Sequence, residues 1–314
     1  MNSASTILVA GSANLDFVVR AEHIPAPGET VLGRGFETFP GGKGANQAIA
    51  CARAGGVATR MLLALGDDAL AVPLEKSLRD AGVQLHIVRS TGIPSGAAFI
   101  CVADSAQNAI TVAPGANAML RPDHLPSLAG VSHLLLQLEI PVDTVLAYAL
   151  AARARGVVVV LNAAPAQGLP AALLATVDIL IVNEGELAVL AGPTASVDEG
   201  IAHLAVPNVI VTLGERGCRA RTPQGWLWQA AYLVQPLDTT AAGDTFCGVL
   251  AAALHQGRAM PDALALASAA AAIACTRAGA QASIPSRAEV EAFMQANVQA
   301  NVRANVQANV QAKS

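Results

Sequence analysis

The segment Asp238–Phe246 places small residues before a single carboxylate, at the start of an Ala- and Leu-rich stretch. Small residues at 241–243 let a ligand approach the backbone, and the free amides and dipole of a first helical turn favour a bound anion. Asp244 would lie in that turn, where its carboxylate faces the same anion and can accept a proton. The segment therefore predicts proton abstraction beside a bound phosphate. Alternatively, Asp238 or Thr240 caps a helix and Asp244 is a favourable first-turn acid.

A second glycine-rich string, Gly41–Ala48, lies just ahead of a predicted helix. It differs from a P-loop because Gly44 follows Lys43 where Ser or Thr is required, and it lacks the last glycine of the dinucleotide fingerprint. Gly42 would let a ligand approach the backbone, and Asn46 supplies an amide with both donor and acceptor atoms. The string predicts a binding site for a polar ligand. A simple glycine turn before a helix is the alternative.

Three further groups of polar residues follow or begin predicted strands. They are Asn14 and Asp16 in GSANLD, Glu139 in QLEIP, and the pair Asn183 and Glu186 in VNEGE. Each has an ordinary structural explanation: Asp16 as a turn acid, Glu139 as a surface residue after a strand, and Asn183 with Glu186 as a helix cap with a capping-box acid.

Apolar runs rich in Val, Ile and Leu alternate along the chain with longer Ala-rich segments at helical spacing. Such alternation is typical of a parallel sheet covered on both faces. We therefore predict a doubly wound α/β fold with a mostly parallel sheet and helices on both faces. The predicted strands are Ile7–Ala10, Arg60–Leu65, Leu134–Leu138, Val157–Leu161, Ile179–Val182 and Val209–Leu213. The predicted helices are Ala45–Ala54, Ala69–Ala81, Val142–Arg155, Glu184–Leu190, Gly243–His255 and Pro261–Thr276.

Two segments, at about 14–39 and 96–113, interrupt this alternation. The first contains Phe17-Val18-Val19, a turn at Pro25–Gly28 and an extended stretch from Glu29 to Phe39. The second resembles a hairpin formed by Ala97–Val102 and Asn108–Val112. Four short strands without helices predict a small β-sheet inserted into the main domain, in the position of a lid over a site. A further hairpin is expected at Cys218–Thr222 and Trp226–Gln229.

Composition restricts the class of protein. The chain has 314 residues, of which 13% are charged, with a formal net charge of −4 and no basic footprint for nucleic acid. The longest apolar stretch, Ala263–Cys275, is too short to cross a bilayer, and the N-terminus shows no signal peptide. The five cysteines are far apart and the six histidines lack metal-binding spacing. We expect a cytoplasmic protein with reduced thiols and with neither a nucleic-acid nor a membrane partner.

The end of the chain differs in composition from the rest. From Gln295 the sequence repeats QANV with little variation up to Ser314. Its valines would form one drifting stripe on a helix, but Asn and Val are mediocre helix formers. We expect segment 295–314 to be a disordered or frayed appendage to a domain at 1–294, and assign it no function.

The two glycine-rich strings together resemble the paired signatures of the ribokinase branch of the PfkB carbohydrate kinase family. GGKGANQA at 41–48 is similar to the first signature, and DTTAAGDTF at 238–246 is similar to the second. The resemblance extends to about residue 294. It implies a ribokinase-like fold with a β-sheet lid, and dimerisation through that lid, because a small exposed sheet needs covering.

The resemblance also implies a role for each candidate residue. Asp244 matches the catalytic base, beside an anion hole formed by the amides of Ala241, Ala242, Gly243 and Asp244. The implied sugar contacts are Asn14, Asp16, Gly42, Lys43, Asn46, Glu139 and Asp244. The implied ATP contacts are Asn183, Thr212, Gly214, Glu215, Gly217, Gly243 and Ser268. Glu186 would hold Mg²⁺ through water. The implied ligands of an activating K⁺ ion are Asp238, Thr240, Ala274, Arg277, Gly279 and Ser283.

The resemblance implies an ATP-dependent kinase that phosphorylates a sugar, by similarity D-ribose at O5, with Mg²⁺ and K⁺ as cofactors. Deoxyribose, a nucleoside or fructose are the alternative substrates for the same fold. A sugar or nucleotide sensor without catalysis is an alternative of a different class, which the retained Asp244 disfavours. The hypothesis of a Rossmann oxidoreductase has less support, since the glycine fingerprint for a dinucleotide is missing.

Overall fold

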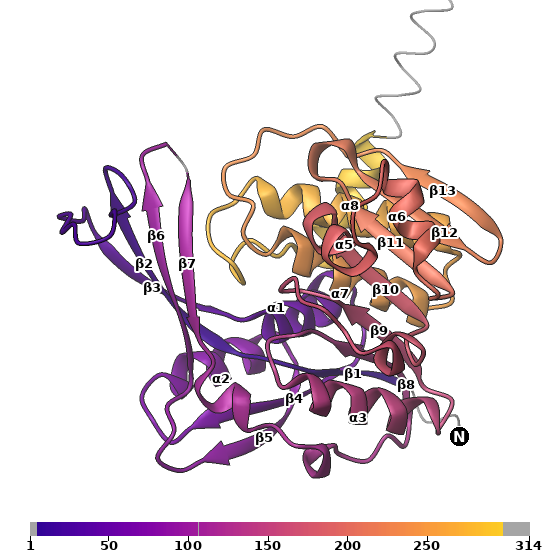
Figure 1. Cartoon of the computed structure of the whole chain (residues 1–314), viewed down its shortest axis with the longest axis horizontal. Coiled ribbons are helices and arrows are strands. Elements are labelled where there is room, and N and C mark those ends of the chain that lie inside the picture. The colour runs from indigo at the N-terminus through magenta and orange to yellow at the C-terminus, as the bar shows by residue number, and fades with distance from the viewer. Residues whose placement is uncertain (1–4, 106, 298–314) are drawn as a thin grey trace, which may run out of the picture.

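The fold is built around one large sheet, seen in a computed structural model that describes residues 5–105 and 107–297. The sheet has nine strands in the order β13-β12-β11-β10-β9-β8-β1-β4-β5, parallel except for the last two strands of the chain (Figure 1). This confirms the predicted fold class. The strands are β1 Thr6–Ala10, β4 Thr59–Gly66, β5 Gln84–Ser90, β8 Val131–Leu136, β9 Val158–Asn162, β10 Ile179–Asn183, β11 Asn208–Thr212, β12 Cys218–Thr222 and β13 Gly225–Gln229.

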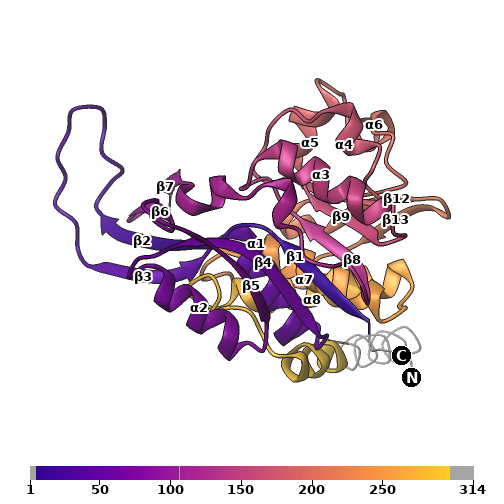
Figure 2. The same cartoon turned by 90° about the horizontal axis from the view of Figure 1, so that it is seen from below.

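Helices cover both faces of this sheet (Figure 2). Along β1, Ile7 and Val9 pack into the core below α1, α2, α7 and α8, whereas Leu8 and Ala10 pack into the core beneath α3, α4, α5 and α6. Both faces of the strand are buried, which explains its uninterrupted apolar sequence. The α-helices are α1 Lys43–Ile49, α2 Ala71–Asp80, α3 Val142–Arg153, α4 Ala171–Leu174, α5 Glu184–Ala191, α6 Val197–His203, α7 Ala242–His255 and α8 Met260–Cys275.

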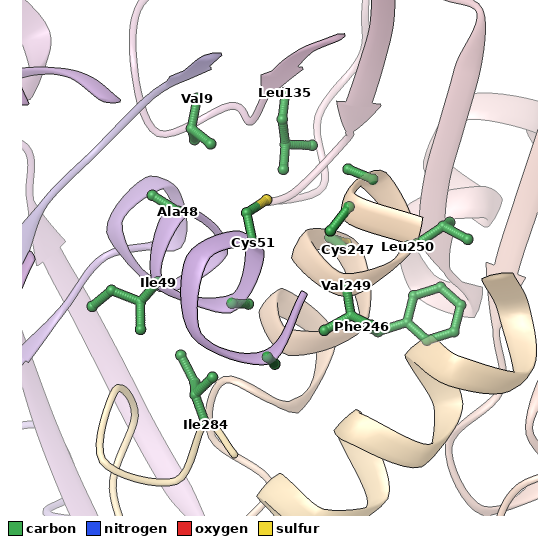
Figure 3. Close-up of a cluster of buried hydrophobic side chains, with 14 of the residues drawn as sticks. Val9, Ala48, Ile49, Cys51, Leu135, Phe246, Cys247, Val249, Leu250 and Ile284 are labelled. Carbon is green, nitrogen blue, oxygen red and sulfur yellow. The ribbon is translucent and has the colours of Figure 1, made fainter. Parts of the chain in front are cut away.

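Small residues make the contact between α7 and the segment of α1 and the turn after it: a Cβ atom at Gly248 would lie 2.6 Å from the Ala50 Cβ atom. In Figure 3 the Cys51 side chain points towards α7, where Cys247 is the nearest labelled residue. α1 is shorter than predicted, because from Ala50 to Ala54 the chain continues as a π-helical turn, η1. The 3₁₀ turns are η2 Gly115–Met119, η3 Pro122–His124 and η4 Gly214–Arg216.

A second, four-stranded sheet projects from the main domain (Figure 1). Its order is β3-β2-β6-β7, and the central pair β2–β6 is parallel whereas the outer pairs are antiparallel. This sheet confirms the predicted insertion, but β3 is shorter than expected: it begins only at Phe36, and residues 22–35 form a long loop. The strands are β2 Asn14–Ala21, β3 Phe36–Gly41, β6 Gly96–Ala103 and β7 Asn108–Ala113. We call these four strands the lid sheet.

The remaining expectations concern the end of the chain and membranes. Residues 287–297 are helical, and the rest of the predicted QANV appendage lies outside the described residues. Within the described ranges, no helix combines the length and the apolar character needed to cross a bilayer.

Candidate active site

The predicted site residues gather where the parallel strands end. Asn183 ends β10, Thr212 ends β11 and Glu139 follows β8, all at the carboxyl edge of the sheet, where open α/β sheets bind ligands. A cavity of about 200 Å³ opens there. Its walls include Lys43, Asn183, Glu186, Thr212, Thr239, Ala241, Gly243 and Asp244.

Asp244 lies in the first turn of α7 with its carboxylate held by two side-chain amides. Asn46 Nδ2 donates to Oδ2 at 2.9 Å, and Gln47 Nε2 donates to Oδ1 at 2.9 Å. Only 8% of Asp244 is exposed, and it borders the cavity. The two glycine-rich strings, 198 positions apart at Asn46 and Asp244, therefore meet in one site.

The N-terminus of α7 has the geometry of an anion site. Ala241, at φ 59°, turns the chain into the helix, and no side chain of the described residues caps it, so the alternative in which Asp238 or Thr240 caps α7 is wrong. The Ala242 amide donates to the Thr239 carbonyl at 3.2 Å. For the amides of Gly243 and Asp244 the described residues offer no acceptor, which leaves both for a ligand.

The residues predicted to contact the sugar lie together at the base of the lid sheet. Glu139 Oε2 accepts hydrogen bonds from Asn14 Nδ2 at 3.4 Å and from the Lys43 amide at 3.0 Å. Burial, then the charges of Glu139 and Asp244, raise the pKa of Asp16 from 3.8 to about 7. These carboxylates and amides form a polar surface suited to the hydroxyl groups of a small ligand.

Gly42 is required by the backbone at this junction. Its φ is 91°, and a Cβ atom there would lie 2.6 Å from the Asn14 amide nitrogen and 2.8 Å from the Ala13 Cα atom. The lid strand β2 and the start of α1 thus touch through backbone alone, which fixes Asn14 next to the first glycine string.

Two residues that the sequence did not single out complete this region. Ser12 Oγ donates to Glu139 Oε2 at 2.5 Å. Asn117 Nδ2 donates to Asn14 Oδ1 at 2.7 Å, and its Oδ1 accepts from the Ala13 amide at 3.0 Å. Asn117 therefore fixes the orientation of the Asn14 amide. It lies in η2, 103 residues further along the chain, so no local pattern could have revealed it.

The raised pKa of Asp16 makes stability dependent on pH. Between about pH 4 and pH 7 the folded protein keeps a proton that the unfolded chain releases, so stability falls as pH rises through this window. We expect Asp16→Asn to remove this loss, so that Tm of the variant minus Tm of the wild type is larger at about pH 8 than at about pH 5. Calorimetry without substrates measures this difference.

The control for this prediction is Asp143→Asn, which removes a solvent-exposed acid from the first turn of α3. Its difference in Tm from the wild type should show no such rise. An Asp16→Asn difference that is equal at both pH values, or larger at acid pH, would contradict the buried and raised state of this carboxyl group.

Lys43 and Glu186, which carry opposite charges, both line the cavity of about 200 Å³. The pKa of Lys43 is raised, chiefly by the charge of Asp244, so the ammonium stays protonated. Burial raises the pKa of Glu186, although its bond from the Asn183 amide at 2.8 Å opposes this. Asn183 Oδ1 accepts from the Glu186 amide at 2.8 Å, so the two form a capping box. Asn183 and Glu186 therefore cap α5 and line the cavity at the same time.

A second cavity, of about 520 Å³, adjoins the first, since Thr212, Thr239 and Gly243 line both. Four of the residues predicted to contact ATP line this second cavity: Gly214, Glu215, Gly217 and Ser268. The apolar wall of this cavity was not predicted, because much of it comes from the loop at residues 231–236, whose sequence shows no periodic pattern. The wall includes Tyr232, Leu233, Val234, Pro236, Phe246 and Ala272.

Asp238 brings together two of the other predicted cation ligands, Thr240 and Gly279, just before α7. Asp238 accepts from the amides of Thr240 and Gly279, each at 2.9 Å. Partial burial disfavours its charged form, but these hydrogen bonds outweigh burial and lower its pKa. Arg277 can contribute only backbone, since its guanidinium pairs with Glu289 at 2.6 Å. The Arg277 amide donates to the Ala274 carbonyl at 3.1 Å, and Ser283 Oγ donates to the Ala280 carbonyl at 2.7 Å.

Known proteins resemble this chain over nearly its whole length. The family described as "pfkB family carbohydrate kinase" matches residues 4–287. A ribokinase from Haemophilus influenzae is 36% identical over 296 residues, which cover 90% of this chain and 96% of the relative. The crystal structure of a Thermotoga maritima ribokinase superposes with a TM-score of 0.87 at 38% identity, covering 93% of this chain and 99% of that one. An Arabidopsis thaliana ribokinase complexed with ribose and ATP superposes with a TM-score of 0.85 at 34% identity, with the same coverage.

Proposed function

Because this chain belongs to the pfkB family of carbohydrate kinases, we propose that it transfers the γ-phosphoryl group of ATP to O5 of D-ribose. The observation that carries the proposal is the position of Asp244. Its carboxylate bonds to Asn46 on the side of the polar lid residues and lines the cavity that continues into the larger one. A base at that junction lies between a sugar and a nucleotide. The Arabidopsis relative, whose structure holds ribose and ATP, supports this choice of substrates.

In this mechanism the protein supplies orientation and charge, which is most of what phosphoryl transfer requires. Asp244 accepts the proton of the attacking hydroxyl. The amides of Gly243 and Asp244, at the positive end of α7, stabilise the oxygens of the transferring phosphoryl group, and Lys43 lines the same cavity. Asn14, Asp16 and Glu139 orient the sugar hydroxyls, and the lid sheet excludes water from them.

The donors at the cavity suit the magnesium ion that accompanies ATP. Glu186 borders the cavity, and among the described residues its carboxylate is engaged at Oε2 alone, by the Asn183 amide. Carboxylate oxygen is a preferred magnesium ligand, usually together with water and substrate phosphates. When bound there, Mg²⁺ would neutralise charge on the phosphates, and Glu186 would hold it through water.

The oxygen-rich loop at Asp238 supports activation by potassium. Asp238 is charged, and the Gly279 amide, which donates to its Oδ2 at 2.9 Å, holds the segment around residue 279 next to it. We expect replacement of KCl by NaCl at equal ionic strength to lower kcat, because a smaller ion fits this loop less well. In Asp238→Ala the two salts should give equal rates. A wild-type rate that is independent of the cation would remove potassium from the proposal.

A coupled ADP-release assay tests the substrate. With ATP, we expect kcat/KM to be highest for D-ribose among D-ribose, 2-deoxyribose, fructose and nucleosides. A higher value for another acceptor would reassign the substrate within the same reaction. Binding of sugar without ADP release for every acceptor would instead indicate a sensor.

The lid sheet supports a homodimer. Its strands expose large apolar side chains, among them Phe36, Phe99 and Ile110, each more than half exposed. Covering such a patch with a second copy would remove apolar surface from water. Light scattering should give twice the mass of the chain.

A cytoplasmic location agrees with the free state of all five cysteines.

A further inference from the structure

Gln47 is a fully buried amide in contact with Asp244, and the mechanism above gives it no task. It lies on α1, and it reaches α7 because the two helices approach closely at Gly248. A Cβ atom at Gly248 would lie 2.5 Å from the Gln47 carbonyl oxygen. Gly248 is one turn beyond Asp244, so this close contact places Gln47 directly beside the carboxylate.

The orientation of the Gln47 amide is fixed by its other partners. Asn162 Nδ2 donates to the Ile181 carbonyl at 3.1 Å, and a carbonyl can only accept, so Asn162 Oδ1 must face Gln47. Gln47 Nε2 donates to that oxygen at 3.0 Å, and Gln47 Oε1 accepts from Gln137 Nε2 at 2.7 Å. The end of Gln47 that faces Asp244 is therefore an N–H donor.

Both oxygens of the carboxylate accept from an amide, but the two amides differ. Gln47 is held by its other partners, so its NH₂ group stays towards Oδ1, and an NH₂ group cannot accept a proton. Asn46 Nδ2 donates to Oδ2, but Asn46 Oδ1 has no partner among the described residues, so this amide can turn and leave Oδ2 for the proton of the substrate. We propose that Gln47 is a positioning residue that keeps Asp244 Oδ1 as a hydrogen-bond acceptor and leaves Oδ2 for the attacking hydroxyl. The proposal rests on the proposed function, in which Asp244 is the base.

Other charged groups surround Asp244 and must stay constant in any test. They are Lys43 on α1, Asp16 on β2, Glu186 on α5 and the Cys247 thiol on α7. None of them is altered by a substitution at Gln47. A shift of the pH profile in a Gln47 variant therefore reports the lost or changed contact with Asp244.

The test compares kcat against pH at saturating ribose and ATP. In Gln47→Met we expect kcat to fall about 10- to 100-fold, the size of a lost hydrogen bond to a charged group. The acid limb of the profile should move up by about one pH unit, since the deprotonated base loses a donor. KM for ribose should change little, because Gln47 lies behind Asp244 rather than among the sugar residues.

Gln256→Met is the matched control. Gln256, at the other end of α7, donates from Nε2 to the Gly55 carbonyl at 2.8 Å and so ties α7 to the end of η1. This variant also removes a glutamine amide hydrogen bond, here between α7 and η1, at the opposite end of α7 from Asp244. We expect kcat and the acid limb to match the wild type.

Gln47→Glu keeps the test decisive if Gln47→Met does not fold. This variant has the same shape, and its charge repels that of Asp244, so the acid limb should again move to higher pH. An unchanged limb in a folded Gln47 variant, or a rise in KM at constant kcat, would overturn the proposal. If the wild type itself shows no ATP-dependent phosphorylation of any sugar, the proposed function fails and the role of Gln47 fails with it.

Discussion

Asp244→Asn is expected to lower kcat by about 10²–10⁴-fold, the usual effect of losing a general base. Asparagine keeps the size of the side chain, but its amide cannot take up the proton of the attacking hydroxyl. Sugar binding should stay nearly unchanged, since Asn14, Asp16 and Glu139 remain in place. Steady-state kinetics with ATP and ribose, together with calorimetric titration of ribose, measure both quantities.

The control for Asp244→Asn is the same substitution at Asp262. Asp262 lies in the first turn of α8, as Asp244 does in α7, but it is exposed to solvent. Its replacement should leave kcat unchanged. Turnover close to normal in Asp244→Asn would exclude the carboxylate as the base, whereas a loss of ribose binding would make Asp244 mainly a substrate ligand.

Lys43→Met is expected to lower kcat by about 10²–10³-fold, comparable to removing one preorganised donor from a transition state. The half-buried Lys43 ammonium group lies within the influence of the charges of Asp244, Glu139 and Glu186, and the Asp244 charge contributes most to raising its pKa. It supplies positive charge to the cavity that the first turn of α7 also lines. Methionine retains much of the aliphatic stem but removes the charge that balances the phosphoryl oxygens.

Lys76→Met provides the comparison for Lys43. Lys76 lies on the surface of α2 and pairs with Asp80 at 2.6 Å, so its loss should not alter kcat. If Lys43→Met showed normal kcat with a higher KM for ribose, the ammonium group would belong to sugar binding instead. Near-normal values of both constants would leave charge balance to Mg²⁺ and the helix amides.

The sequence predicted those parts of the fold in which burial determines composition. Ile179–Val182 is apolar throughout because helices cover both faces of β10, and this run was identified as a strand. Gln84–Ser90 was missed because β5 lies at the edge of the sheet and pairs only with β4, so it carries polar residues. The end of α1 was misplaced because its change to a π-helical turn depends on packing, not on helix propensity.

The candidate site was predictable where backbone chemistry fixed the residue type. Gly42 and the small residues before Asp244 are required by close contacts and by the start of a helix, so they stand out in the sequence. Gln47 and Asn117 do not stand out in the sequence, since the role of each buried amide depends on a hydrogen-bond partner more than 100 residues away. The apolar nucleotide wall around Tyr232 was also missed, because an irregular loop has no periodicity to read.

The two adjoining cavities have a consequence for the order of chemical events. Thr212, Thr239 and Gly243 belong to both walls, so a nucleotide in the larger cavity and a sugar beside Asp244 would lie end to end. In the proposed mechanism Asp244 abstracts a proton and does not carry phosphate, so no covalent enzyme intermediate is needed. Such a ternary complex leads to a single displacement, which inverts the stereochemistry at phosphorus.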